Sequence, residues 1–162
     1  MNKLNVKPEE IITLNDYPVH SLKVLNEYVE KCKSKQLIDF IPVIEKDIMK
    51  TFFDKQTLEK FKEFEKTHPS AKYFMLDGSH RTTALTINNA PIEIITYRND
   101  KDIANSKNYW AGEVFDKSPL TLSLEENCNI LNNHFKKKTY FFTVLEKTEK
   151  MRFEGYLKNI KI

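Results

Sequence analysis

The residues best suited to chemistry lie directly after an apolar run that ends at Asp77 and Gly78. Ser79, His80 and Arg81 follow at once. The chain has three glycines in 162 residues, so a glycine at this junction indicates a backbone position that needs its freedom. A helix beginning here directs unpaired N–H groups and its positive dipole end at the turn. Because His80 and Arg81 add donors suited to phosphate, the pattern predicts an anion-binding turn. The alternative is a surface turn with solvated side chains.

A strand and a helix must flank this turn for its donors to converge. Residues 72–76 are mainly apolar and predict the strand that leads into the turn, and residues 79–89 suit the helix that leaves it. Residues 92–97 are rich in β-branched side chains and predict the next strand. The strand–helix–strand order resembles a crossover unit, of a kind that also occurs in mixed sheets.

Two further helices precede the turn in the sequence. Ser21 is suited to cap the first, which runs to about residue 33 with apolar residues at spacings of three and four. Asp54 opens the second, an amphipathic helix that ends at about residue 67. Between them, residues 40–44 predict a short strand, in which Pro42 indicates an edge strand or a strand start.

The last third of the chain is predicted to be mainly helical. Ser123 and Thr143 each begin a capping box, and Gly155 is suited to end the final helix. The fold class that follows is α+β. The expected divisions are a mixed core over residues 1–100, a helical insertion in it at about residues 50–70, and a helical extension over residues 101–162 that packs on the core.

Composition narrows the class of protein. The net charge is +3, from 26 basic and 23 acidic residues that are thoroughly mixed, and this balance does not demand nucleic acid. Lys136–Lys138 is interpreted as a solvated helix end. No apolar stretch approaches the roughly 20 residues of a membrane span, and the N-terminus lacks a signal-peptide core. Cys32 and Cys128 fall on apolar helical faces without neighbouring metal ligands, which predicts buried reduced thiols and a cytoplasmic protein.

The segment from Leu76 to Ala84, with Asp-Gly-Ser-His-Arg at its centre, resembles the ParB/sulfiredoxin superfamily. The likeness covers about residues 4–97, and the nine-residue motif is its specific part. The resemblance implies a mixed sheet with flanking helices, and a turn that holds nucleotide phosphates. It also implies that the helix at 54–67 is an insertion between two strands that are usually close in sequence.

The branches of the superfamily differ at this motif. Sulfiredoxins carry a nucleophilic cysteine where this chain has Ser79, and because serine cannot perform thiolate chemistry, sulfiredoxin activity is not expected. ParB partition proteins carry an acidic residue and two arginines in the turn and a helix-turn-helix region afterwards, for which this chain gives no clear signal. The Asp-Gly-x-His-Arg form is closest to the free serine kinases, although residues 17–20 lack the Glu that those kinases carry near the first helix.

The resemblance implies ATP or another nucleotide at the turn, with Mg²⁺. Asp77 and His80 are then the candidate catalytic residues, and Asp77 would hold Mg²⁺ or accept a proton from a hydroxyl group, or instead cap the turn. Ser79 is also suited to be the N-cap of the following helix. His20 is a possible general base or, more simply, a solvated loop histidine. The residues expected to contact phosphate are Gly78, Ser79, His80, Arg81 and Thr82.

Three hypotheses of function follow. The first is a nucleotide-dependent, kinase-like phosphotransferase that acts on a small hydroxylated molecule, through positioning and electrostatic stabilisation. The second is a nucleic-acid-binding or nuclease-like module that uses the same phosphate site. The third is a non-catalytic, nucleotide-binding regulator, to which the absent Glu points. No membrane is expected as a partner.

Overall fold

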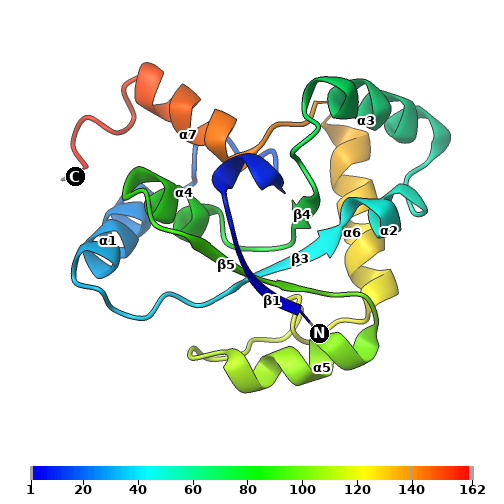
Figure 1. Ribbon diagram of the computed structural model, residues 1–162, viewed down its shortest axis with the longest axis horizontal. Coiled ribbons are helices and arrows are strands. Elements are labelled where there is room, and N and C mark those ends of the chain that lie inside the picture. Colours follow the sequence, from blue (N-terminus) through cyan, green and yellow to red (C-terminus); the bar gives the residue numbers. More distant parts are fainter. Residues whose placement is uncertain (1, 139, 161–162) are drawn as a thin grey trace.

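A five-stranded mixed sheet lies at the centre of the fold (Figure 1). The computed structural model describes residues 2–138 and 140–160, and within them the strand order is β1-β5-β3-β4-β2. The β1–β5 and β3–β4 pairs are antiparallel, whereas the β2–β4 and β3–β5 pairs are parallel. The strands are β1 (Asn2–Val6), β2 (Ile11–Ile12), β3 (Ile41–Glu45), β4 (Tyr73–Met75) and β5 (Ile92–Thr96).

Helices cover both faces of this sheet. Because the sheet contains both parallel and antiparallel pairs, the described chain is an α+β protein. In Figure 1, α1, α4 and α7 lie at one end of the view, and α2, α3 and α6 at the other. The α-helices of the described residues are α1 (Leu22–Lys33), α2 (Lys46–Lys50), α3 (Lys55–Thr67), α4 (Ser79–Ile87), α5 (Asp100–Ser106), α6 (Leu124–Lys137) and α7 (Val144–Phe153). Two short 3₁₀ helices are η1 (Pro8–Glu10) and η2 (Lys107–Tyr109).

Alternate side chains of the central strand β3 enter different cores, as the period of two along a strand requires. Ile41 and Val43 pack in one cluster with Leu85 of α4 and Val144 of α7. Ile44 packs in another cluster, to which α3 and α6 contribute. Burial on both faces explains why β3 reads as a continuous apolar run. Helices from beyond residue 100 therefore share their cores with the strands before it.

An aromatic cluster fills the core beneath α3 and α6. Its rings meet at tilted or edge-to-face angles, with centroid separations from 4.7 to 6.3 Å, which is the arrangement that aromatic quadrupoles favour. The cluster consists of Phe53, Phe61, Phe74, Phe135 and Phe141. Since these residues come from β4, α3, α6 and two connecting segments, the cluster joins distant parts of the sequence.

The predicted helix starts are confirmed. Ser21, Asp54, Ser123 and Thr143 are N-caps, and the side chain of each accepts a hydrogen bond from the backbone N–H three residues on. Gly155 follows the end of α7 with φ of +86°, as expected for a glycine that ends a helix. These features depend on residues close in sequence, which is why the sequence reveals them.

Two predictions about the sheet need correction. The strand–helix–strand segment does not form a parallel crossover pair, because β3 lies between β4 and β5 and runs antiparallel to β4 but parallel to β5. Pro42 lies in a central strand rather than an edge strand. The strand-start alternative holds, since Pro42 is the second residue of β3. The short helices α2 and α5 give too little periodicity to be delimited from sequence.

Three properties bear on the class of protein. Cys32 and Cys128 are free thiols, and burial raises the pKa of Cys128 to about 12. The described residues contain no group of three His, Cys, Asp or Glu side chains placed to hold a metal ion. None of the helices in the described part of the chain has the length and apolar character that a membrane span needs.

The aromatic cluster makes a testable prediction about stability. Phe61→Ala removes a fully buried ring and should lower the free energy of unfolding by about 3–5 kcal/mol, because it leaves a cavity among the other rings. The measurement is urea denaturation followed by circular dichroism. Phe153→Ala is the matched control, since that side chain is 92% exposed and its loss should change stability by less than about 0.5 kcal/mol. Equal effects of the two variants would contradict the structure.

Candidate functional site

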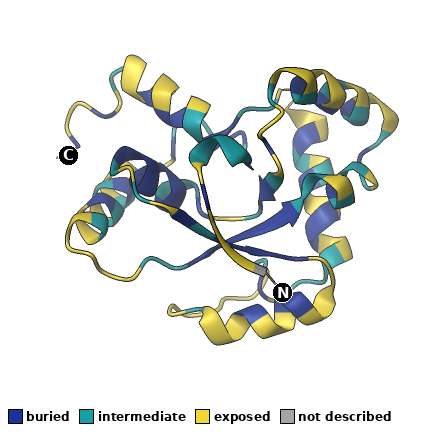
Figure 2. Cartoon of the chain, in the orientation of Figure 1, coloured by how far each residue is buried: buried dark blue, intermediate teal, exposed yellow. Residues whose placement is uncertain are grey.

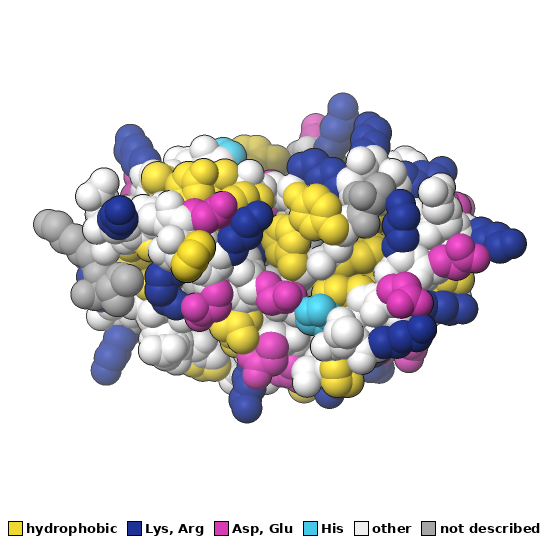
Figure 3. Space-filling view, turned by 90° about the horizontal axis from the view of Figure 1, so that it is seen from above, with side chains coloured by type: hydrophobic (Ala, Val, Ile, Leu, Met, Phe, Trp, Pro, Cys, Tyr) yellow, Lys and Arg dark blue, Asp and Glu magenta, His cyan; other side chains and the backbone are white. Residues whose placement is uncertain are grey.

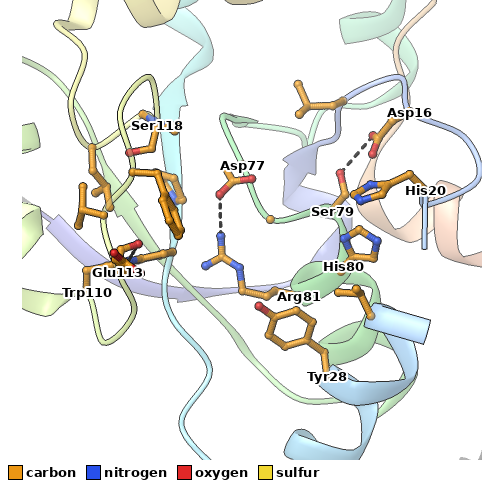
Figure 4. Close-up of a pocket in the computed structure, with 18 residues that line it drawn as sticks. Asp16, His20, Tyr28, Asp77, Ser79, His80, Arg81, Trp110, Glu113 and Ser118 are labelled. Carbon is orange, nitrogen blue, oxygen red and sulfur yellow. Dashed lines mark hydrogen bonds and ion pairs between the residues drawn. The ribbon is translucent and has the colours of Figure 1, made fainter. Parts of the chain in front are cut away.

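The parallel pairing of β2 with β4 creates the candidate site. Because Ile12 pairs with Phe74 in parallel, the segments that leave the two strands emerge at the same edge of the sheet. One is residues 13–21, which leads to α1, and the other is the turn at 76–78, which leads to α4. A pocket of about 390 Å³ opens between them and the loop at 110–120. In Figure 4, the labelled residues of the 110–120 loop lie on one side of the pocket, and Asp16, His20 and the labelled residues of α4 lie on the other.

Gly78 is required at the turn. Its φ is +115°, in the left-handed region, and a Cβ built on it would lie 2.6 Å from the Cδ1 atom of Ile41. Gly78 is also the N-cap of α4, so Ser79 is the first helical residue and not the cap that the sequence suggested. The reason is that the glycine conformation already ends the strand and starts the helix, which frees the Ser79 hydroxyl for another contact.

The first turn of α4 lines the pocket and carries the first backbone donors of the helix. An α-helix leaves its first N–H groups without intrahelical partners, and here the ladder begins with Thr82 N–H donating to the Gly78 carbonyl. Ser79, His80 and Arg81 precede that bond, and all three line the pocket. Thr82 does not line it. Its side chain is buried, and its hydroxyl donates a hydrogen bond to the Gly78 carbonyl oxygen at 2.9 Å.

Arg81 has a structural role that the sequence did not reveal: its side chain joins the segment before β3 to the turn after β4. Its buried guanidinium donates to the carbonyl oxygens of Asp39 and Phe40 and, from the other amino group, to Oδ2 of Asp77 at 3.2 Å. The guanidinium also lies 5.1 Å from the centre of the Trp110 ring, within the range of a cation–π contact. The side chain lines the pocket but is held by protein groups on several sides.

Two histidines meet beside the Ser79 end of the pocket. The His80 and His20 rings are edge-to-face with centroids 4.4 Å apart, and both residues line the pocket. Nε2 of His80 accepts the Ser21 backbone N–H at 3.3 Å, so the neutral ring carries its proton on Nδ1. Burial lowers the pKa of His80, and the nearby His20 lowers it further. The structure thus brings the candidate base His20, which is exposed, next to the candidate catalytic residue His80.

A buried lysine lies behind the turn, and sequence reasoning missed it. Lys147 of α7 has a side chain only 1% exposed, and its Nζ donates to Oδ1 of Asp16 at 3.0 Å. The same oxygen accepts the Ser79 hydroxyl at 3.1 Å (Figure 4). The sequence does carry a signal for this burial. Lys147 lies between Val144 and Met151 at helical spacing, and both of these apolar residues are buried on one face of α7.

The opposite wall of the pocket is apolar and aromatic, and it was also not predicted. Trp110 packs edge-on against Phe40 with ring centroids 5.6 Å apart. Phe115 lies in the same loop and is 65% exposed. Tyr28 of α1 also lines the pocket, but Figure 4 shows it on the other side, beside Arg81. The loop is tied to the sheet because the Ala111 N–H donates to Oδ1 of Asp39 at 2.7 Å.

The charges that line the pocket favour a cation as well as an anion. Asp16, Asp77 and Glu113 are the acidic lining residues, and Arg81 is the lining cation apart from the histidines. Asp77 is 58% exposed at its side chain, and one oxygen accepts from Arg81. One carboxylate cannot hold Mg²⁺ alone, but Mg²⁺ in proteins commonly takes one or two carboxylates together with substrate phosphates. Asp77 fits that role only when a phosphate is present.

Comparisons with known proteins do not place the chain in a family. No protein-family model, no curated protein and no solved structure matches it. The likeness to the ParB/sulfiredoxin superfamily therefore rests on the sequence of residues 4–97, in which the motif is the specific part.

The contacts of Arg81 predict a stability defect. Arg81→Ala should lower the free energy of unfolding by about 2–4 kcal/mol, because it leaves the carbonyl groups of Asp39 and Phe40 without their charged donor. Arg81→Lys should recover only part of this, since an ammonium cannot reproduce the fork. Chemical denaturation measures the effect, and Arg152→Ala, at an exposed pair on α7, is the control. A stable Arg81→Ala variant would show that the guanidinium is not structural.

The environments of two histidines lead us to predict that the folded protein is less stable in mild acid. Burial lowers the pKa of both His80 and His134, and the Nε2 atom of each accepts a backbone N–H, from Ser21 and Asn15 respectively. Below the unfolded value of about 6.5, the unfolded chain binds more protons than the folded chain, so stability falls as pH falls toward the folded pKa.

Thermal unfolding at pH 7.5, 6.5 and 5.5 measures this dependence. The midpoint should fall with pH in the wild type, and the fall should be smaller in His134→Gln and His80→Gln, which keep an acceptor but do not titrate. An unchanged pH dependence in both variants would show that other groups cause it.

Proposed function

We propose that this protein binds a nucleotide with Mg²⁺ and transfers a phosphoryl group to a small hydroxylated molecule. The proposal includes a ParB/sulfiredoxin-like fold for the core. One observation carries it: the first turn of α4, opened by Gly78, lines a pocket whose other wall holds the partly buried ring of Trp110 and the exposed ring of Phe115. Phosphates suit a helix N-terminus, and nucleobases suit aromatic faces. The two walls therefore match the two ends of a nucleotide.

The size and lining of the pocket support a small molecule rather than a polymer. Its volume of about 390 Å³ lies within the range of ordinary ligand sites. Basic and acidic side chains are interspersed over the face in Figure 3, whereas nucleic-acid binding relies on clustered basic residues. The nucleic-acid alternative would need an affinity that falls steeply with salt.

Mg²⁺ is part of the proposal because the pocket does not supply enough positive charge. Arg81 already pairs with Asp77, and Lys147 pairs with Asp16. A polyphosphate entering alone would meet the carboxylates of Asp16, Asp77 and Glu113. When bound, Mg²⁺ would neutralise phosphate charge during transfer, and Asp77, which lines the pocket with its side chain 58% exposed, would hold it.

Phosphoryl transfer requires mainly positioning and charge stabilisation, and the residues at the turn can supply both. The backbone N–H groups of α4 would hold the phosphates, and His80 would add a donor from Nδ1. His20, exposed at the pocket and next to His80, would accept the proton of the hydroxyl substrate.

Isothermal titration with Mg·ATP, Mg·ADP and Mg·CTP tests the binding step. At least one should bind, and EDTA should weaken its affinity by tenfold or more, because Mg²⁺ offsets the acidic lining. Asp77→Asn should reduce this dependence on Mg²⁺, and Asp47→Asn, an exposed change on α2 outside the pocket, should not. Absence of binding by all three nucleotides would end the proposal. Nucleotide binding without phosphoryl transfer to any hydroxylated acceptor would favour the third hypothesis, a non-catalytic, nucleotide-binding regulator.

Stacking of the base makes a separate prediction. Phe115→Ala should weaken nucleotide binding by roughly tenfold, in line with the stacking energy of one aromatic ring, while the unfolding free energy stays unchanged because the ring is exposed. Phe153→Ala removes another exposed ring, which lies outside the pocket, and should leave the affinity as it was. Equal affinities of the two variants would place the base elsewhere.

A further inference from the structure

We propose that Ser79 is itself a phosphoryl acceptor, with Asp16 as the base that takes its proton and Lys147 as the buried cation that positions Asp16. This inference rests on the proposed nucleotide site and assigns a covalent step to it. It uses three residues that lie far apart in the sequence and meet at one carboxylate oxygen, Oδ1 of Asp16.

The orientation of the Ser79 hydroxyl supports this assignment. Its Oγ donates a hydrogen bond to Asp16 at 3.1 Å, so the proton is directed to the carboxylate and the oxygen lone pairs are left for an electrophile. Ser79 lines the pocket and is the first residue of α4. A terminal phosphate held by the N–H groups of this turn would lie close to that oxygen, as a transfer step requires.

The ion pair between Lys147 and Asp16 is buried at its lysine end, whereas the Asp16 side chain is 35% exposed. A buried pair often costs as much in desolvation as it gains, so it is weak support for stability. Lys147 nonetheless occupies a core position of α7 and is directed at Asp16. Burial lowers the pKa of Lys147, and Asp16 opposes that change. The hydrogen bond from the ammonium fixes the carboxylate beside the Ser79 hydroxyl, which is the position a general base needs.

Backbone contacts hold this arrangement in place. Ile12 forms an isolated bridge with Thr143, and the Thr13 N–H donates to the Phe142 carbonyl at 3.0 Å. Thr143 is the N-cap of α7. The segment that carries Asp16 and the helix that carries Lys147 are therefore joined at their adjacent ends, and the pair does not depend on a loose surface loop.

The Ser79 oxygen forms a bond to the terminal phosphorus of the nucleoside triphosphate, and the bond from that phosphorus to the bridging oxygen breaks. The electron pair leaves with the nucleoside diphosphate, and the hydroxyl proton passes to Asp16. The product is a phosphoserine at the first position of α4, where the helix dipole favours its negative charge.

Mass spectrometry of the full chain incubated with Mg·ATP tests the inference. The intact protein should gain one phosphoryl group, and peptide mapping should place it on Ser79. Ser79→Ala should abolish the gain, and Ser79→Thr, which keeps a hydroxyl, should retain it. Ser70→Ala is the control, since Ser70 is exposed and outside the pocket. A rate independent of protein concentration identifies transfer within one molecule.

The ion pair is tested with both charges removed, because Asp16→Asn alone would leave Lys147 buried without a partner. The Asp16→Asn, Lys147→Met double variant should fold and bind nucleotide but modify Ser79 at least about a hundredfold more slowly, the usual loss when a general base is removed. A purely structural pair would leave the rate unchanged in the folded variant.

The outcomes separate the two proposals. If titration shows that the nucleotide binds but the mass does not change, or the phosphoryl group maps to another residue, the assignment of Ser79 is overturned and the proposed function stands. If no nucleotide binds, both are overturned.

Discussion

The guanidinium of Arg81 is the interaction on which the site depends. It joins the start of β3, through the carbonyl groups of Asp39 and Phe40, to the turn after β4, through Asp77. Trp110 lies across the same group and brings the opposite wall of the pocket to it. A charge placed among so many partners is satisfied without solvent, which explains how an arginine can be almost completely buried at the first turn of a helix.

This use of Arg81 changes the chemical character of the turn. The sequence suggested a turn whose His80 and Arg81 side chains bind an anion, whereas the structure provides backbone N–H groups beside acidic side chains. Oriented backbone donors attract an anion through fixed partial charges, and the nearby carboxylates oppose a second negative charge. A ligand that carries its own counter-ion satisfies both conditions, and this is the physical basis of our proposal that a nucleotide would bind here together with Mg²⁺.

The sequence predicted the parts of the fold that depend on near neighbours. Helix starts at Ser21 and Thr143 follow from side-chain caps within three residues, and the need for glycine at 78 follows from its place between a strand and a helix. Strand order was not predictable, because pairing such as that of Ile12 with Phe74 depends on contacts between distant segments. For the same reason the motif residues were found, but Asp16 and Lys147, 131 positions apart, were not connected. Local patterns gave no indication of the aromatic wall.

The two walls of the pocket differ in how much of the fold they support. Helix α4 is buried from Arg81 to Ile87 (Figure 2), so most substitutions along it disturb the core. The loop across from it is anchored near Trp110 and at the buried Leu120, while residues 111–117 between them are exposed. Side chains in this short exposed span can therefore be exchanged with little cost to folding, while the turn at the start of α4 stays the same. The lining of one wall of the pocket can thus change independently of the core that supports the other.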